Sequence, residues 1–187
     1  RPPGGGTVYL CSADRDGMMV SFIQSNYLGF GSGVVLPELG ISFQNRAAGF
    51  TLESGHPNEA VAGKRPRHTI IPGFITRDDQ AVGPFGVMGG EMQPQGHLQV
   101  ISSMLDHGLN PQAALDAPRW QLAGGLDVDV EPGTDERLLA SLIERGHRPV
   151  VAADRLSFGR GQIILRLEEG VYAAGSEPRA DGAAVGY

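Results

Sequence analysis

The feature that most constrains the fold is a series of short strand-like runs joined in pairs by tight turns. Thr7–Ala13 alternates apolar and polar residues, and Asp14-Arg15-Asp16-Gly17 separates it from a similar run at 18–24. A turn of this composition, with glycine where a left-handed backbone is tolerated, is typical of a β-hairpin. The sequence predicts two more such hairpins, formed by residues 70–76 with 81–88 and by residues 162–167 with 171–174.

Helical periodicity replaces this alternation after residue 88. Leu98, Ile101 and Leu105 recur at helical spacing, with the helix starting near Gln93 and ending at Gly108. Asn110 followed by Pro111 is typical of an N-cap and the first helical position, which predicts a short helix reaching residue 117.

A third helix is expected after a short strand that places Val128 and Val130 on one face. Thr134 is its expected N-cap and Gly146 its end. Its expected buried stripe consists of Leu138, Leu139, Leu142 and Ile143. Because strands come in hairpin pairs and helices follow one another, the sequence predicts a one-domain α+β fold with antiparallel sheets rather than a βαβ fold.

Charge and cysteine content narrow the function classes. The net charge is −6 and the basic residues are scattered, which argues against nucleic acid and anionic membranes as partners. No apolar run approaches the roughly 18 residues that would span a bilayer. Cys11 is the single cysteine, so the sequence contains no disulfide framework and no cysteine metal pattern. We expect Cys11 to pack as a small buried hydrophobic residue, and the other interpretation is a reactive thiol. The compartment stays open, with the cytoplasm slightly favoured over the periplasm or secretion.

Three glycines run directly into Thr7, which opens the first predicted strand. One interpretation is a flexible linker before a strand, since β-branched residues commonly open strands. The other is a Gly6–Thr7 bond that is cut, which would make Thr7 a new N-terminus. A threonine hydroxyl needs a nearby base to act as a nucleophile, and a free α-amine with a pKa of about 7.7–8.0 supplies one.

Six ordered blocks resemble the small, C-terminal subunit of γ-glutamyltranspeptidases. They are TVYLCSADRDG, FGSGVVLPELGI, GKRPRHTIIP, FGVMGGEMQPQGH, DHGLNPQAALDAPRW and SEPRADGAAVGY. The resemblance covers nearly the whole chain and implies the four-layer αββα sandwich of N-terminal-nucleophile hydrolases. It also implies that residues 1–6 precede an autocleavage site and that residues 7–187 form the small subunit. The implied partner is the large N-terminal subunit of the same precursor.

The resemblance implies roles for four residues. Thr7 would be the nucleophile and its own α-amine the base, while Ser25 would hydrogen-bond the nucleophile. Gly89 and Gly90 would present backbone N–H groups to the oxyanion. No metal or other cofactor is required. Ser25 could instead be an ordinary surface serine of a strand. The glycine pair could instead form an ordinary tight turn between strand and helix.

The residues that hold the γ-glutamyl group in the family differ in this chain. Counted without gaps from Thr7, Tyr27 replaces the strand asparagine and Arg46 a carboxamide or carboxylate. Gly49 stands where the family has the aspartate that binds the α-ammonium. His68 and Thr69 replace the two serines that bind the α-carboxylate.

These departures predict an acidic or neutral acyl group without a free amine, unless Glu91 replaces the missing carboxylate. Arg46 and Glu91 could instead be solvated, and His68 could be an ordinary loop residue. The resemblance implies an autoprocessing threonine amidohydrolase or acyltransferase that cleaves γ-glutamyl-type, glutathione-like amides or peptides through an acyl-threonine. The alternatives are an acylase for glutaryl or other non-glutamyl groups, near the cephalosporin-type acylases, and a non-catalytic relative.

Overall fold

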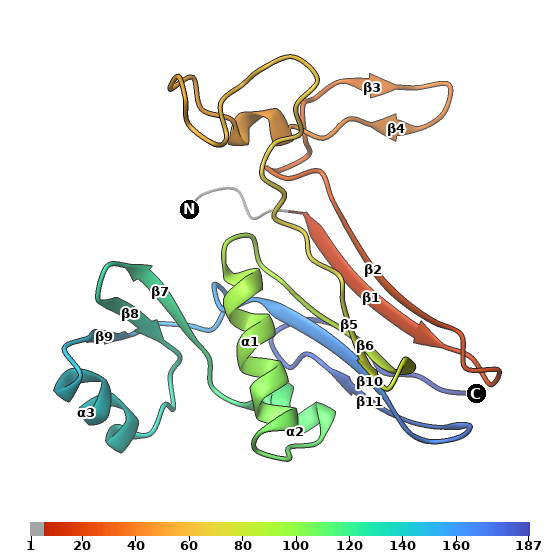
Figure 1. Cartoon of the computed structure of the whole chain (residues 1–187), viewed down its shortest axis with the longest axis vertical. Coiled ribbons are helices and arrows are strands. Elements are labelled where there is room, and N and C mark those ends of the chain that lie inside the picture. The colour runs from red at the N-terminus through yellow and green to blue at the C-terminus, as the bar shows by residue number, and fades with distance from the viewer. Residues whose placement is uncertain (1–5) are drawn as a thin grey trace.

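The computed structural model describes residues 6–187, and its first element is the predicted N-terminal hairpin (Figure 1). Strands β1 (Thr7–Ala13) and β2 (Met19–Ser25) pair antiparallel in continuous register, ending on the pair Thr7 and Ser25. The turn is closed by the Asp14 carboxylate, which accepts the N–H groups of Asp16 and Met18 at 3.0 and 2.9 Å. Gly17 takes a φ of +87°, so the glycine requirement of this turn is confirmed.

A four-stranded antiparallel sheet contains the other two predicted hairpins. Its order is β11-β10-β6-β5. The turn between β5 and β6 uses Asp78 and Asp79 at φ values of +51° and +61°, the backbone signs of a primed hairpin turn. The strands are β5 (Gly73–Arg77), β6 (Gln80–Met88), β10 (Arg160–Glu168) and β11 (Val171–Ser176).

Helices and the N-terminal hairpin cover opposite faces of this sheet (Figure 1). Helices α1 (Met92–Leu105) and α2 (Pro111–Asp116) pack on one face and β1–β2 on the other. The main core lies under the helices and consists of Phe85, Val87, Val100, Met104, Ala114, Leu115 and Ile163. The α+β class is therefore confirmed, with a helical layer and two sheet layers in the described residues.

The buried face of α1 differs from the sequence expectation. Ile101 packs against the core, but Leu98 and Leu105 are 61% and 53% exposed. Val100 and Met104 are buried instead, because the sheet meets the helix along the line that passes through Gly96. None of the helices within residues 6–187 is long and apolar enough to cross a membrane.

A third sheet departs from the predicted antiparallel pattern. Strands β7 (Trp120–Gly124) and β8 (Asp127–Val130) form a hairpin, but β9 (Arg148–Val151) pairs parallel to β8. Helix α3 (Glu136–Glu144) supplies the crossover that a parallel pair requires. The expectation of antiparallel sheets is therefore wrong for this βαβ unit, although Val128 and Val130 are buried as predicted.

Helix α3 also begins and packs differently from the expectation. Asp135, rather than Thr134, is its N-cap and accepts the N–H of Arg137 at 2.8 Å. The Thr134 hydroxyl donates to the Glu131 carbonyl instead. The predicted stripe is only partly buried: Leu139 and Leu142 are half-buried, while Leu138 is 48% and Ile143 is 60% exposed.

The segment between the hairpins forms a separate lobe at the top of Figure 1. It contains the short strands β3 (Val35–Leu36) and β4 (Ile41–Ser42) and the 3₁₀-helix η1 (Arg46–Gly49). An irregular segment at 51–68 follows, with one isolated bridge between Thr51 and Glu59.

Four buried charged side chains fasten the C-terminal segment to the body of the chain. Arg119 binds Glu177 at 2.8 Å, and Arg179 binds both Glu177 and Glu131. The Arg119 guanidinium also donates to the carbonyls of Phe158 and Gly159. Since each buried charge has an opposite partner, the usual cost of burying an ion is offset within this cluster.

Candidate active site

Thr7 and Ser25 meet at the open end of the N-terminal hairpin. The continuous β1–β2 register places them opposite one another, and the Thr7 hydroxyl donates to Ser25 Oγ at 2.8 Å. Ser25 Oγ also accepts the N–H of Tyr27 at 2.9 Å, which fixes its position. The expected contact is present, and the catalytic role of the two hydroxyls stays a prediction.

The bond that would be cut lies at the protein surface. Gly6 is exposed, and a Cβ on it would lie 3.6 Å from the Gly29 carbonyl oxygen. Residues 1–5 of the predicted leading segment lie outside the described residues. Thr7 is half-buried and Gly6 is exposed, so the bond between them lies at the solvent-exposed start of β1.

Gly89 and Gly90 connect β6 to α1. They adopt φ values of +152° and +60°, and their carbonyls accept the N–H groups of Met92 and Gln93. A Cβ on Gly89 would lie 3.0 Å from the Cα of Gly159, so this backbone approach requires glycine. Within residues 6–187, no protein acceptor takes the N–H of either glycine. Both N–H groups are therefore available as donors, and their role at an oxyanion stays a prediction.

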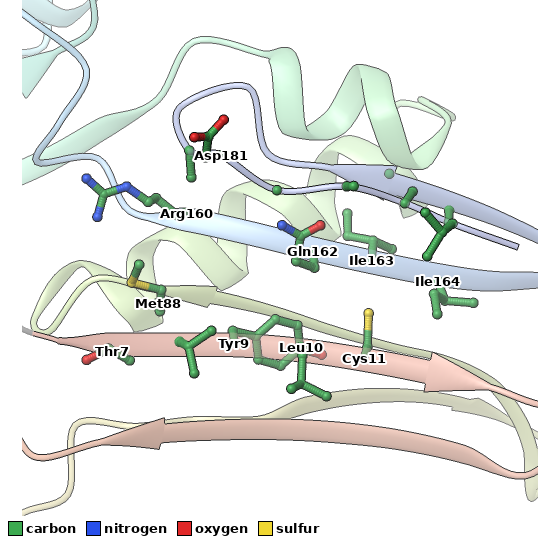
Figure 2. A pocket seen from close by; sticks show the side chains of 18 residues that line it. Thr7, Tyr9, Leu10, Cys11, Met88, Arg160, Gln162, Ile163, Ile164 and Asp181 are labelled. Atoms are coloured by element: carbon green, nitrogen blue, oxygen red, sulfur yellow. The ribbon is translucent and has the colours of Figure 1, made fainter.

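A cavity of about 340 Å³ brings the end of β6 and the start of β1 together. Figure 2 shows Met88, which precedes the glycine pair, across from Thr7 in this cavity. The half-buried Cys11 lines the same cavity, and burial raises the pKa of its thiol to about 11. The Cys11 thiol is therefore protonated near neutral pH, in keeping with the expected packing role.

Arg46, Tyr27 and Thr69 gather beside Ser25. The Arg46 guanidinium donates to Thr69 Oγ1 at 3.1 Å and to the Ser25 carbonyl at 3.4 Å, and it lies 5.4 Å from the centre of the Tyr27 ring. Arg46 is only 6% exposed, and burial lowers its pKa. Tyr27 has a φ of +76°, an uncommon conformation for a residue with a side chain. The interpretation of Arg46 as a solvated residue is wrong.

The remaining predicted residues lie at the edge of this group. Gly49 ends η1, and a Cβ on it would lie 3.9 Å from the Tyr27 hydroxyl. His68 is exposed. Glu91 is also exposed and forms an ion pair with Arg67, a residue that sequence reasoning did not single out. The basic block GKRPRH contains Arg67, but no local pattern links it to Glu91.

His97 on α1 supports the strand that leads to the glycine pair, and sequence reasoning missed it. Its Nε2 accepts the N–H of Val87 at 3.0 Å, and its ring packs 5.1 Å from that of Phe85. Burial lowers the pKa of His97 to about 4. Acceptance of a strand N–H requires an unprotonated Nε2, so this contact needs the neutral imidazole.

The depressed pKa of His97 predicts a loss of stability in weak acid. An unfolded histidine has a pKa of about 6.5, so between about pH 6.5 and 4 the unfolded state binds more protons than the folded state. Unfolding free energy should thus fall as pH drops through that window, by about 2 kcal/mol at pH 5. Urea unfolding of the wild type and of His97→Gln, which keeps an acceptor but does not titrate, tests this. Equal pH dependence in both proteins would contradict it.

Comparisons with known proteins agree with this geometry. The gamma-glutamyltranspeptidase family matches residues 1–187. The chain is 38% identical over 192 residues to a glutathione hydrolase-like YwrD proenzyme of Bacillus subtilis and 37% identical over 197 residues to an oxamate amidohydrolase proenzyme of Klebsiella pneumoniae. Both matches cover 100% of this chain and 37% of the relative, so the chain spans little more than a third of their length.

A solved structure is similar to this chain in both fold and sequence. The cephalosporin acylase from Bacillus halodurans superposes with a TM-score of 0.87 at 56% identity. The match covers 96% of this chain and 34% of that one.

Proposed function

The chain belongs to the gamma-glutamyltranspeptidase family, and we propose that it carries the nucleophile of an autoprocessing threonine amidohydrolase. The hydrogen bond between Thr7 and Ser25 at the first residue of β1 is the observation that supports this most directly. This bond positions the Thr7 hydroxyl at the first residue of β1. A cut after Gly6 would make that residue the N-terminus.

Each chemical step can be assigned to a group of this chain. Cleavage of the Gly6–Thr7 bond frees the Thr7 α-amine, which takes the proton of the Thr7 hydroxyl as that oxygen attacks the amide carbonyl. The N–H groups of Gly89 and Gly90 stabilise the oxyanion. The protonated α-amine then gives its proton to the leaving amine, and an acyl-threonine remains. Water or a second amine attacks this ester and regenerates Thr7.

Two substrate classes are supported by different observations. The glutathione hydrolase-like relative favours γ-glutamyl amides such as glutathione. The oxamate amidohydrolase and the cephalosporin acylase favour amides whose acyl group is not glutamyl. The second class is also favoured by Gly49 and Arg46, which offer a cation and no carboxylate beside Ser25.

The large N-terminal subunit of the same precursor is the proposed partner. The two relatives are named as proenzymes, and the chain spans 37% of their length. The outer face of the N-terminal hairpin exposes Val8, Leu10, Val20 and Phe22, each at least 43% exposed. An apolar sheet face of this kind needs a covering layer, and the rest of the precursor can provide it.

Intact mass spectrometry of the full-length precursor, followed over time with turnover of an acyl p-nitroanilide, tests the proposed function. We expect two chains, the smaller starting at Thr7, and activity that rises in step with the cut. A folded protein that stays uncut and inactive would contradict the proposal and favour the non-catalytic alternative.

A further inference from the structure

Three arginine side chains are withdrawn from solvent, and one of them differs from the others. Arg119 and Arg179 each bind a buried carboxylate, at 2.8 Å from Glu177 and at 2.5 Å from Glu131 respectively. Arg46 is 6% exposed, yet no carboxylate in the described part of the chain forms an ion pair with it. A buried cation without a counter-ion is costly, so a fold that keeps one needs a reason for it.

The groups around Arg46 are neutral and leave part of its guanidinium free. It donates to the hydroxyl of Thr69 and, at the longer distance of 3.4 Å, to the carbonyl of Ser25. The Tyr27 ring faces the guanidinium and contributes a cation–π contact. A guanidinium has five N–H donors, and these two bonds leave enough of them for a carboxylate, which arginine binds in a fork.

Arg46 and the proposed nucleophile, Thr7, both contact the same residue. That residue is Ser25, whose carbonyl accepts a hydrogen bond from Arg46 and whose hydroxyl accepts one from Thr7. We propose that Arg46, held against Tyr27, binds a carboxylate at the far end of a short acyl group, so that the substrates are monoamides of dicarboxylic acids that lack an ammonium group. This rests on the proposed function, because it places the acyl group on Thr7.

The surroundings of Arg46 disfavour an ammonium in the same place. Gly49, the last residue of η1, has no side chain, and Glu91 is already paired with Arg67. An ammonium beside the Arg46 cation would meet repulsion without an acceptor. A carboxylate would restore the charge balance that Arg119 and Arg179 have within the chain.

Wild-type substrate choice is the first test. We expect kcat/KM of the processed enzyme to be at least tenfold higher for glutaryl p-nitroanilide than for valeryl p-nitroanilide, which has the same length without the carboxylate. We also expect glutaryl to exceed γ-glutamyl p-nitroanilide, which adds the ammonium. Free glutarate should inhibit competitively, and more strongly than glutamate. A tenfold preference for the γ-glutamyl compound would overturn the proposal and make Glu91 the first candidate for binding the ammonium.

Removal of the Arg46 charge is the second test. Arg46→Gln should lower kcat/KM for the glutaryl compound on the order of 10- to 100-fold, the range of a lost charge-assisted hydrogen bond, and leave valeryl within threefold. Arg46→Lys should retain part of the preference. Arg145→Gln, a charge removal at the exposed end of α3, is the control and should change neither substrate. Equal losses on both substrates would show a structural role only, and the proposal would be wrong.

Gly49→Asp tests the site without altering Arg46. Residues 46 and 49 are three apart in a 3₁₀-helix, where such side chains eclipse, so the new carboxylate would lie beside the guanidinium. The Gly49 backbone needs no left-handed conformation, and a Cβ there meets only an ordinary contact. We expect glutaryl turnover to fall and γ-glutamyl turnover to rise in relative terms, and more so in the double variant with Arg46→Gln. An unchanged ratio in Gly49→Asp would count against the assignment.

These outcomes are separable from failure of the proposed function. If the protein is not cut and cleaves no anilide, the amidohydrolase assignment fails. If it is cut and cleaves valeryl and glutaryl anilides equally, the threonine chemistry stands and the role of Arg46 is refuted. Glutarate binding measured by calorimetry on the processed protein adds a readout independent of turnover, and it should be lost in Arg46→Gln.

Discussion

Thr7→Ala should leave the protein as a single uncut chain without amidase turnover. The substitution removes the hydroxyl that would attack both the Gly6 carbonyl and the substrate amide, and alanine offers no nucleophilic atom in its place. Folding should survive, because Thr7 is half-buried at the end of a strand and contributes only one side-chain hydrogen bond, to Ser25. A denaturing gel and a p-nitroanilide assay on the full-length variant measure the two effects.

Two further substitutions sharpen this test. Thr7→Ser keeps a β-hydroxyl, so it should still be cut, at an altered rate. Ser12→Ala removes an exposed hydroxyl from the same strand and should behave as the wild type. Two chains on the gel from Thr7→Ala would show that the cut does not depend on Thr7, and the nucleophile assignment would be wrong.

Gly90→Val should reduce turnover by roughly 10²–10³, the scale of a lost oxyanion donor, if the backbone shifts. Gly90 lies at a φ of +60°, where a β-branched residue is strained, so valine should pull this peptide unit out of place. Stability should fall less than activity, because a Cβ on Gly90 meets no other atom within 4 Å.

Gly108→Val is the matched control for backbone strain. Gly108 has a φ of +67° and equally open surroundings, but it follows the far end of α1. Both variants should lose similar stability, while only Gly90→Val should lose turnover on the processed enzyme. Wild-type turnover in Gly90→Val would remove this glycine from the mechanism, and equal losses in both variants would point to strain alone.

Local signals account for the parts of the site that sequence reasoning found. A turn at residues 14–17 sets the register of the hairpin it closes, so Thr7 and Ser25 had to lie opposite one another once both strands formed. The glycine pair is likewise a local feature, since a strand that ends at Met88 and a helix that starts at Met92 need a sharp connection. Asn110 capped its helix as predicted for the same reason.

Periodicity alone was insufficient where a face had to be chosen. Apolar residues of α1 lie on more than one side, and only contact with the sheet decided that Val100 and Met104 are buried while Leu98 is exposed. In α3 the predicted stripe exists as a pattern, yet Leu138 and Ile143 stay exposed in this chain. Burial depends on what the rest of the fold brings to a helix, which its own residues do not specify.

The sequence by itself determined the hairpins, the α+β class, the family and the threonine at the start of β1, because each depends on neighbours in the chain or on ordered blocks along it. The tertiary structure alone decided the parallel pairing of β8 with β9, the ion pair of Arg67 with Glu91 and the burial of Arg46 without a carboxylate partner among residues 6–187. These join residues that are far apart in sequence, and their energies depend on solvent exclusion and charge balance, which arise only when the distant segments pack together.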